Sequence, residues 1–159
     1  MYQEAKRKGA LVVITGCITA ADRNLIKQYS GDSIVGVTEI GSIKSVVDEA
    51  LKNHPVHMIH TQTMPPLNMP KVRKDPSVEI IPISLGCKGA CTFCQTKLAR
   101  GDLRSYPIQD IIACAKKACK EGVTEIWLTS EDTGAYGRDI GTSLMTLLGE
   151  MLRCTEKSV

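Results

Sequence analysis

Short apolar runs alternate with amphipathic segments along the first third of the chain. Two runs rich in β-branched residues, 10–15 and 33–37, predict strands. Segments 20–29 and 42–53 space their apolar residues as helices do, and the apolar face of the second comprises Ile43, Val46, Val47 and Leu51. Because strands and helices alternate, we expect residues 1–53 to form part of an α/β domain with a parallel sheet.

This pattern stops at residues 54–77, where most of the prolines of the chain lie: Pro55, Pro65, Pro66, Pro70 and Pro76. Such a segment is typical of an extended linker. The three histidines of the chain, His54, His57 and His60, lie in this segment. Their spacing matches no specific ligand pattern, so a metal site on these histidines is not favoured.

A second series of strands and helices begins at Val78. Runs 78–83 and 124–129 predict strands, and segments 107–121 and 142–153 predict helices. The first of these helices has Pro107 at its start and Gly122 after its end, where each residue type is preferred. Its predicted buried face comprises Ile108, Ile111, Ile112, Ala115, Ala118 and Cys119. We therefore interpret Cys114 and Cys119 as core or surface thiols of this helix and not as ligands.

Three cysteines after the 78–83 strand, Cys87, Cys91 and Cys94, have the spacing C-x3-C-x2-C. Three thiolates can hold a [4Fe-4S] cluster with one iron open. This arrangement is typical of radical S-adenosylmethionine (SAM) enzymes, whose open iron takes the amino and carboxylate groups of SAM. Phe93, just before the third cysteine, could pack against an adenine. Two other interpretations of these cysteines stay open: a zinc site with a distant fourth ligand, or ordinary thiols.

Composition narrows the class of protein. The chain has 159 residues, of which 43% are hydrophobic, and no apolar run reaches the ~18 residues of a membrane span. Its first residues are too charged to begin a signal peptide, and its seven cysteines are an odd number. These features favour a reducing compartment, the cytoplasm, over a disulfide framework.

Positive charge is concentrated around the three cysteines. The net charge of the chain is +3, but residues 71–120 hold ten basic and four acidic residues, a local charge of +6. A basic rim around a reaction centre suits a polyanion such as RNA. For Lys116, Lys117 and Lys120 a solvated helix face is the simpler interpretation.

Segments 86–94, 99–101, 104–107 and 125–139 closely resemble the tRNA methylthiotransferases. The resemblance covers nearly the whole chain. Loop 131–137 places it with the eukaryotic and archaeal branch, which acts on threonylcarbamoyladenosine at position 37 of tRNA. The resemblance implies a partial methylthiotransferase domain at 1–53, a Pro-rich linker at 54–77 and a partial radical SAM domain at 78–159. The implied fold is the C-terminal part of a Rossmann-like parallel-sheet domain, followed by the first two β/α units of a radical SAM partial TIM barrel.

The same resemblance implies the chemistry. Members of the family add a methylthio group to C2 of the adenine, using SAM at a [4Fe-4S] cluster that Cys87, Cys91 and Cys94 would hold. A second [4Fe-4S] cluster has three ligands, of which Cys17 matches the last. Phe93, Ser130 and Glu131 would contact SAM, and Arg100 and Arg104 would meet RNA phosphate or the SAM carboxylate. The implied partners are the tRNA anticodon loop, SAM and an electron donor.

Parts of the family pattern have no counterpart in this sequence. We expect a fragment that lacks the first two ligands of the second cluster, most of the barrel strands and the C-terminal RNA-binding barrel. A C-terminal tail that attaches some members to membranes is also not expected. Two alternatives follow: a catalytically inactive iron–sulfur or zinc-binding fragment, or another radical SAM enzyme. Loop 131–137 argues against the second alternative.

Overall fold

The computed structural model describes residues 1–59 and 63–155, so His60 lies outside the described residues. The chain forms two compact units. Unit 1 comprises Met1–Pro65 together with Cys91–Arg100, and unit 2 comprises Pro66–Ala90 together with Gly101–Val159. Among the described residues, no helix is both long and apolar enough to cross a membrane.

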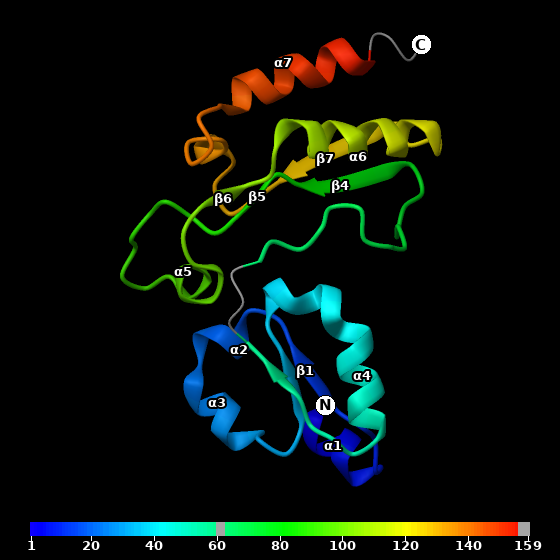
Figure 1. The fold of residues 1–159 in the computed structure, drawn as a ribbon, viewed down its shortest axis with the longest axis vertical. Helices are drawn as coiled ribbons and strands as arrows, with labels where there is room; N and C mark the ends of the chain where they lie inside the picture. The colour runs from blue at the N-terminus through cyan, green and yellow to red at the C-terminus, as the bar shows by residue number, and fades with distance from the viewer. Residues whose placement is uncertain (60–62, 156–159) are drawn as a thin grey trace. The chain divides into compact units, whose positions relative to one another are not determined.

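Unit 1 is built on a three-stranded parallel sheet in the order β1 (Val13–Thr15), β2 (Ser33–Val35), β3 (His57–Met58). Its helical segments are α1 (Tyr2–Arg7), α2 (Ile18–Ala21), α3 (Arg23–Gln28), η1 (Val37–Ser42), α4 (Ile43–Leu51) and α5 (Gln95–Arg100). In Figure 1 the strands run between α3 and α4. Ile34 and Val35 of the central strand are fully buried, and α4 packs on that strand with Val46 and Ala50 turned inward. These aliphatic contacts form the core of the unit.

The predicted strands and helices of this unit are present, with two corrections. The helix expected at 20–29 is divided into α2 and α3, because Asp22 between them is extended and its carboxylate accepts a hydrogen bond from the Asn24 amide. Leu51, expected on the buried face of α4, is 67% exposed, and Ala50 is buried in its place. The third strand, β3, lies within the proline-rich segment and was not predicted, because two residues carry no readable periodicity.

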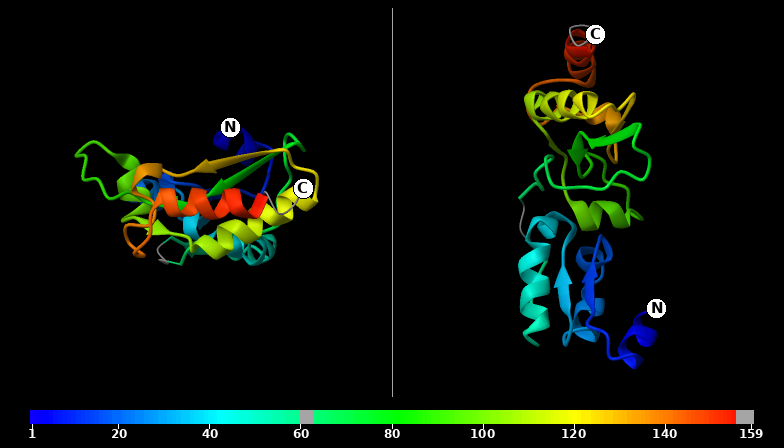
Figure 2. Two further views of the ribbon diagram at one scale, coloured as in Figure 1. Left: turned by 90° about the horizontal axis from the view of Figure 1, so that it is seen from above. Right: turned by 90° about the vertical axis from the view of Figure 1, so that its right-hand side faces the viewer.

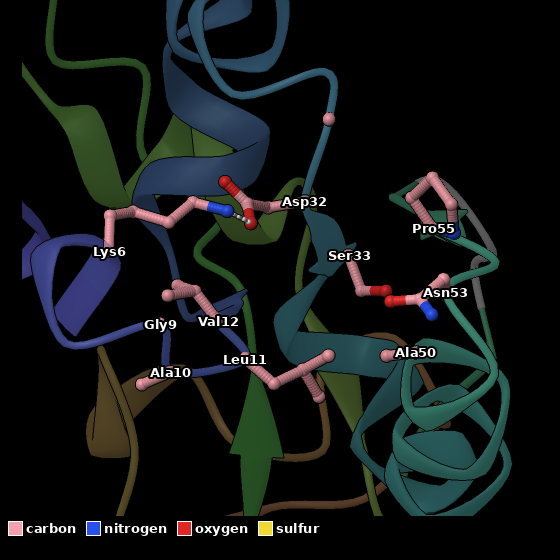
Figure 3. Close-up of a pocket in the computed structure, with 11 residues that line it drawn as sticks. Lys6, Gly9, Ala10, Leu11, Val12, Asp32, Ser33, Ala50, Asn53 and Pro55 are labelled. Carbon is pink, nitrogen blue, oxygen red and sulfur yellow. Dashed lines mark hydrogen bonds and ion pairs between the residues drawn. The ribbon is translucent and has the colours of Figure 1, made fainter.

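Asp32 attaches helix α1 to the sheet. The Tyr2 hydroxyl donates to Asp32 Oδ2 at 2.5 Å, and Lys6 Nζ lies 2.5 Å from Asp32 Oδ1. Tyr2 also packs edge-to-face on Tyr29, with ring centroids 4.4 Å apart. Figure 3 shows the Lys6–Asp32 ion pair on one side of a pocket of about 470 Å³, with Ser33 on another side. These contacts hold α1 beside the end of the sheet at which β2 begins.

We predict that Asp32→Asn destabilises unit 1 by about 1–3 kcal/mol, because a buried carboxylate with two donors is lost. Burial raises the pKa of Asp32, but the hydrogen bonds from Lys6 and Tyr2 outweigh it and hold the pKa below 3.8. Since the folded-state pKa of Asp32 is depressed, its contribution to stability is fully present at neutral pH. It is lost as the pH falls below 3.8 and through the lower folded-state pKa. Urea unfolding followed by tyrosine circular dichroism at neutral and acid pH measures both effects.

The matched control for this prediction is Asp48→Asn, which alters an exposed ion pair with Lys44 on α4. We expect that variant to unfold within about 0.5 kcal/mol of the wild type. Equal losses in the two variants, or an undiminished Asp32 effect at acid pH, would show that Asp32 does not anchor α1.

Unit 2 contains two small sheets. β4 (Val78–Pro82) and β7 (Glu125–Thr129) are parallel, and β5 (Ser84–Leu85) and β6 (Arg104–Ser105) are antiparallel. The helical segments are α6 (Ile108–Lys120), η2 (Thr133–Ala135) and α7 (Leu144–Thr155). Figures 1 and 2 show α7, α6 and the β4–β7 pair as successive layers. The four longest elements lie where the apolar pattern predicts them, whereas the two-residue strands β5 and β6 were not predicted.

The faces of the β4–β7 pair differ in burial. Glu79 and Ile81 are each 1% exposed on the face that α6 covers, while Ile80 and its partner Trp127 are about half exposed on the other face. α6 contributes Ile111, Ala115 and Ala118 to the core, as its periodicity predicts. Cys114 and Cys119 are partly buried on the same helix, in agreement with their interpretation as helix thiols.

Candidate functional site

Cys87 follows β5 in unit 2, at a point where two chain segments approach closely. Its amide donates to the Gly101 carbonyl at 3.2 Å. The preceding Gly86 has φ +74°, and a Cβ there would lie 2.2 Å from the Asp102 carbonyl oxygen. Only glycine fits this position, because any side chain would push the two segments apart. The sequence Leu-Gly-Cys therefore places the first cysteine directly at the end of a strand.

Cys91 and Cys94 precede α5 in unit 1. The Cys94 amide donates to the Cys91 carbonyl at 3.1 Å, which forms a tight turn before the helix. Cys91 is exposed and Cys94 is partly buried. α5 itself packs against α2 and η1, so tertiary contacts hold the segment that carries these two thiols.

Backbone amides donate to two of the three sulfurs. Gly89 N lies 3.2 Å from Cys87 Sγ, and Lys97 N lies 3.4 Å from Cys94 Sγ. Hydrogen bonds of this kind stabilise thiolates and tune iron–sulfur clusters. No disulfide joins cysteines in the described part of the chain. The donor chemistry thus fits an iron–sulfur group. Within residues 1–59 and 63–155 no three His, Cys, Asp or Glu side chains converge as a metal site, so the ligand assignment stays a prediction.

The predicted cosubstrate residues Ser130 and Glu131 directly follow β7 in unit 2. Both are partly buried. Ser84, which follows β4, lies at the same edge, since Pro82 and Thr129 at the strand ends are register partners. The hydroxyl oxygens of Ser84 and Ser130 are buried, and neither has a hydrogen-bond partner among the described residues. Buried hydroxyls are rarely left unsatisfied, so this edge is suited to a polar ligand.

Sequence reasoning missed Ser84, although one signal was available. A serine at the end of an apolar strand, three residues before the first motif cysteine, is a polar group at the edge where parallel α/β folds bind ligands. Phe93, by contrast, was predicted as an adenine contact and is 84% exposed. Its side chain is therefore accessible to a ligand.

Cys17 lies at the start of α2, immediately after β1 and Gly16. Arg100, the last residue of α5, donates its Nε proton to Cys17 Sγ at 3.3 Å. The structure thus directs this guanidinium toward a thiol of unit 1, a contact between residues 83 positions apart that the sequence did not predict. Arg104, the other predicted arginine, is partly buried in β6.

Part of the basic segment is used inside the fold. Lys71 and Arg73 both pair with the buried Glu79, and Arg73 also lies 2.6 Å from Glu121. These two cations therefore neutralise carboxylates of unit 2 and contribute less to a surface field. Lys116, Lys117 and Lys120 are exposed on α6, as a solvated helix face predicts.

No protein-family model matches the chain. Curated relatives do: the threonylcarbamoyladenosine tRNA methylthiotransferases of Danio rerio and Homo sapiens are each 45% identical in an alignment of 158 positions that covers 94% of this chain. The chain matches a segment of these enzymes. A Pyrococcus abyssi protein, described as a probable enzyme of the same name, is 38% identical over 153 residues.

The predicted resemblance to the eukaryotic and archaeal methylthiotransferases is confirmed by these relatives. The chain spans 28% of the length of the Danio rerio enzyme, 27% of the human enzyme and 36% of the Pyrococcus abyssi protein.

Proposed function

We propose that this chain is part of a radical SAM methylthiotransferase that adds a methylthio group to C2 of threonylcarbamoyladenosine at position 37 of tRNA. The observation that carries the proposal is 45% identity over 94% of the chain to enzymes of that name. The spacing of the motif cysteines supports the same chemistry.

Cys87, Cys91 and Cys94 would hold a [4Fe-4S] cluster, and the Gly89 and Lys97 amides would continue to donate to the first and third sulfurs. Such a cluster, when bound, supplies the electron that cleaves SAM. An electron donor must therefore act with the chain. Cys17 would serve as one ligand of a second cluster, with the Arg100 Nε proton directed at its sulfur.

Ser84, Ser130 and Glu131 would bind the methionine part of SAM. The two buried hydroxyls offer hydrogen bonds that the described protein groups leave unused. The Glu131 carboxylate would pair with the ammonium group of SAM, a charge-assisted contact. Phe93, whose ring is exposed, would stack on the adenine.

The RNA partner would be the tRNA anticodon loop. Position 37 lies in a single-stranded loop, where a protein can reach a base edge without opening a duplex. Exposed Lys74 and Lys88 lie in the basic segment and are suited to phosphate contacts. We also propose a reducing compartment, the cytoplasm, because the number of cysteines is odd and three of them have metal-ligand spacing.

Two partial domains would support this site. The parallel β1–β2–β3 sheet with its helices is consistent with part of a Rossmann-like domain, and β4–α6–β7 is consistent with the start of a partial TIM barrel. In the second case Ser130 and Glu131 follow the carboxyl end of a strand, which is where α/β barrels hold their active sites.

Nucleoside analysis tests the proposal. The reconstituted chain is incubated anaerobically with reductant, SAM and tRNA that carries threonylcarbamoyladenosine, and the nucleosides are measured by mass spectrometry. We expect the 2-methylthio derivative and 5′-deoxyadenosine. Modification of another nucleoside or of a protein would identify a different radical SAM enzyme. Bound zinc without SAM cleavage would identify an inactive metal-binding fragment.

A further inference from the structure

The loop that follows β7 is fastened to β6 by one carboxylate. The Ser105 amide donates to Asp139 Oδ2 at 2.7 Å, and the Ser105 hydroxyl donates to Asp139 Oδ1 at 2.6 Å. Ser105 is 6% exposed, so water has little access to the two donors, although the Asp139 side chain that accepts from them is exposed. Asp139 thus occupies the place beside β6 that a further strand would take.

Two more hydrogen bonds join the same segments. The Gly137 amide donates to the Ser105 hydroxyl oxygen at 2.9 Å, and the buried Tyr136 hydroxyl donates to the Tyr106 carbonyl at 2.8 Å. Gly137 has φ +82°, and a Cβ there would lie 2.6 Å from Thr142 atoms, so this turn requires glycine. The loop is therefore held in one conformation along its second half.

β6 connects this loop to the first motif cysteine. Ser105 pairs with Ser84, and Arg104 pairs with Leu85, in a ladder of only two residue pairs. β5 continues directly into Gly86 and Cys87. A two-stranded ladder this short has only marginal stability by itself. The position of β6 therefore depends on contacts that β6 makes with segments other than β5.

We propose that Asp139 is a positioning residue: its carboxylate keeps the loop that begins with Ser130 and Glu131 in register with the β5–β6 ladder that carries Cys87. The inference deepens the proposed function and rests on it, since it assigns to Asp139 the alignment of the SAM-binding loop with a cluster ligand. A carboxylate suits this place because the Ser105 amide and hydroxyl both donate to it, whereas an amide side chain has one acceptor oxygen and can keep only one of these two bonds unchanged.

Hydrogen exchange of the metal-free chain tests the coupling, because it needs no cofactor. In Asp139→Asn we expect the Ser105 and Gly137 amides to exchange about tenfold faster, and the Cys87 amide to follow them. Accelerated exchange at Ser105 and Gly137 with Cys87 unchanged would overturn the proposal, because Asp139 would then act only locally. Unchanged exchange at all three amides would also overturn it.

Two further variants keep this test decisive. Ser105→Ala keeps the backbone hydrogen bond from residue 105 to Asp139 but removes the hydroxyl, which also accepts from the Gly137 amide. It should therefore speed exchange directly at Gly137 and change the amides of residue 105 and Cys87 less than Asp139→Asn does, even where Asp139→Asn folds poorly. Glu150→Gln makes the same carboxylate-to-amide change on α7, beside Arg153, and should leave all three amides as in the wild type.

SAM binding to the reconstituted chain tests the functional half. We expect Asp139→Asn to retain wild-type iron content and to raise the dissociation constant for SAM about tenfold. An unchanged dissociation constant despite faster Cys87 exchange would overturn the role of Asp139 in SAM alignment. A wild-type chain that binds no SAM would instead defeat the proposed function, while the exchange result would still decide the coupling.

Discussion

Replacing Cys87 with serine is expected to abolish the iron–sulfur content of the reconstituted chain. A hydroxyl is a much poorer ligand for iron than a thiolate, and only three cysteines have the motif spacing. A supporting hydrogen bond alone is worth 10–100-fold in metal affinity, so loss of a ligand should cost at least about 100-fold. Iron and sulfide analysis, together with the visible absorbance of the cluster, measures this loss.

Cys119→Ser is the matched control for that experiment. Cys119 is a partly buried thiol on α6 and lies outside the motif. We expect the variant to load iron as the wild type does. Normal iron content in Cys87→Ser, or equal loss in both variants, would show that the motif does not hold the cluster.

Glu79→Gln is expected to destabilise unit 2 by about 3 kcal/mol. Glu79 is 1% exposed in the middle of β4 and pairs with Lys71 and Arg73. Removing its charge leaves two cations beside a buried amide. Arg73 keeps Glu121 as a partner and Lys71 is 43% exposed, so both cations can be partly satisfied and the cost lies at the lower end for a buried pair.

Trp127 provides the measurement, because it is the only tryptophan of the chain and lies on β7, beside β4. Urea unfolding followed by its fluorescence reports on the unit that holds Glu79. Glu150→Gln, which alters an exposed pair with Arg153, should change the free energy of unfolding by less than about 1 kcal/mol. A Glu79→Gln variant as stable as this control would mean that the buried network does not stabilise unit 2.

Periodicity predicted the longer elements because each has enough residues to show a face. α6 is the clearest case: Ile111, Ala115 and Ala118 recur at helical spacing, and Pro107 and Gly122 mark its ends. β4 and β7 were recognisable as runs of β-branched and large apolar residues. Such signals are local in sequence, so these elements could be predicted without information on tertiary contacts.

The short elements and the polar contacts were not predictable in this way. β3, β5 and β6 have two residues each, and tertiary pairing alone makes them strands. Asp139 and its partner Ser105 are 34 positions apart, and nothing in either segment indicates the other. The sequence alone assigns Lys71 and Arg73 to a basic rim. Their pairing with Glu79 was not predictable, because the burial of Glu79 depends on the packing of α6 on β4.

The candidate site also has features that were predictable from the sequence and features that were not. The spacing of Cys87, Cys91 and Cys94 and the position of Ser130 and Glu131 after a strand are local features that the sequence shows directly. The orphaned hydroxyl of Ser84 and the contact between Arg100 and Cys17 appear only in the folded chain.

Electron paramagnetic resonance of the anaerobically reconstituted, dithionite-reduced chain, recorded with and without SAM, tests the central claim most directly. We predict a [4Fe-4S]+ signal that changes when SAM is added, because a cluster held by three protein thiolates leaves one of its four irons open to the cosubstrate. A cluster signal that ignores SAM, or bound zinc in place of a cluster, would contradict the assignment of radical SAM chemistry to this chain.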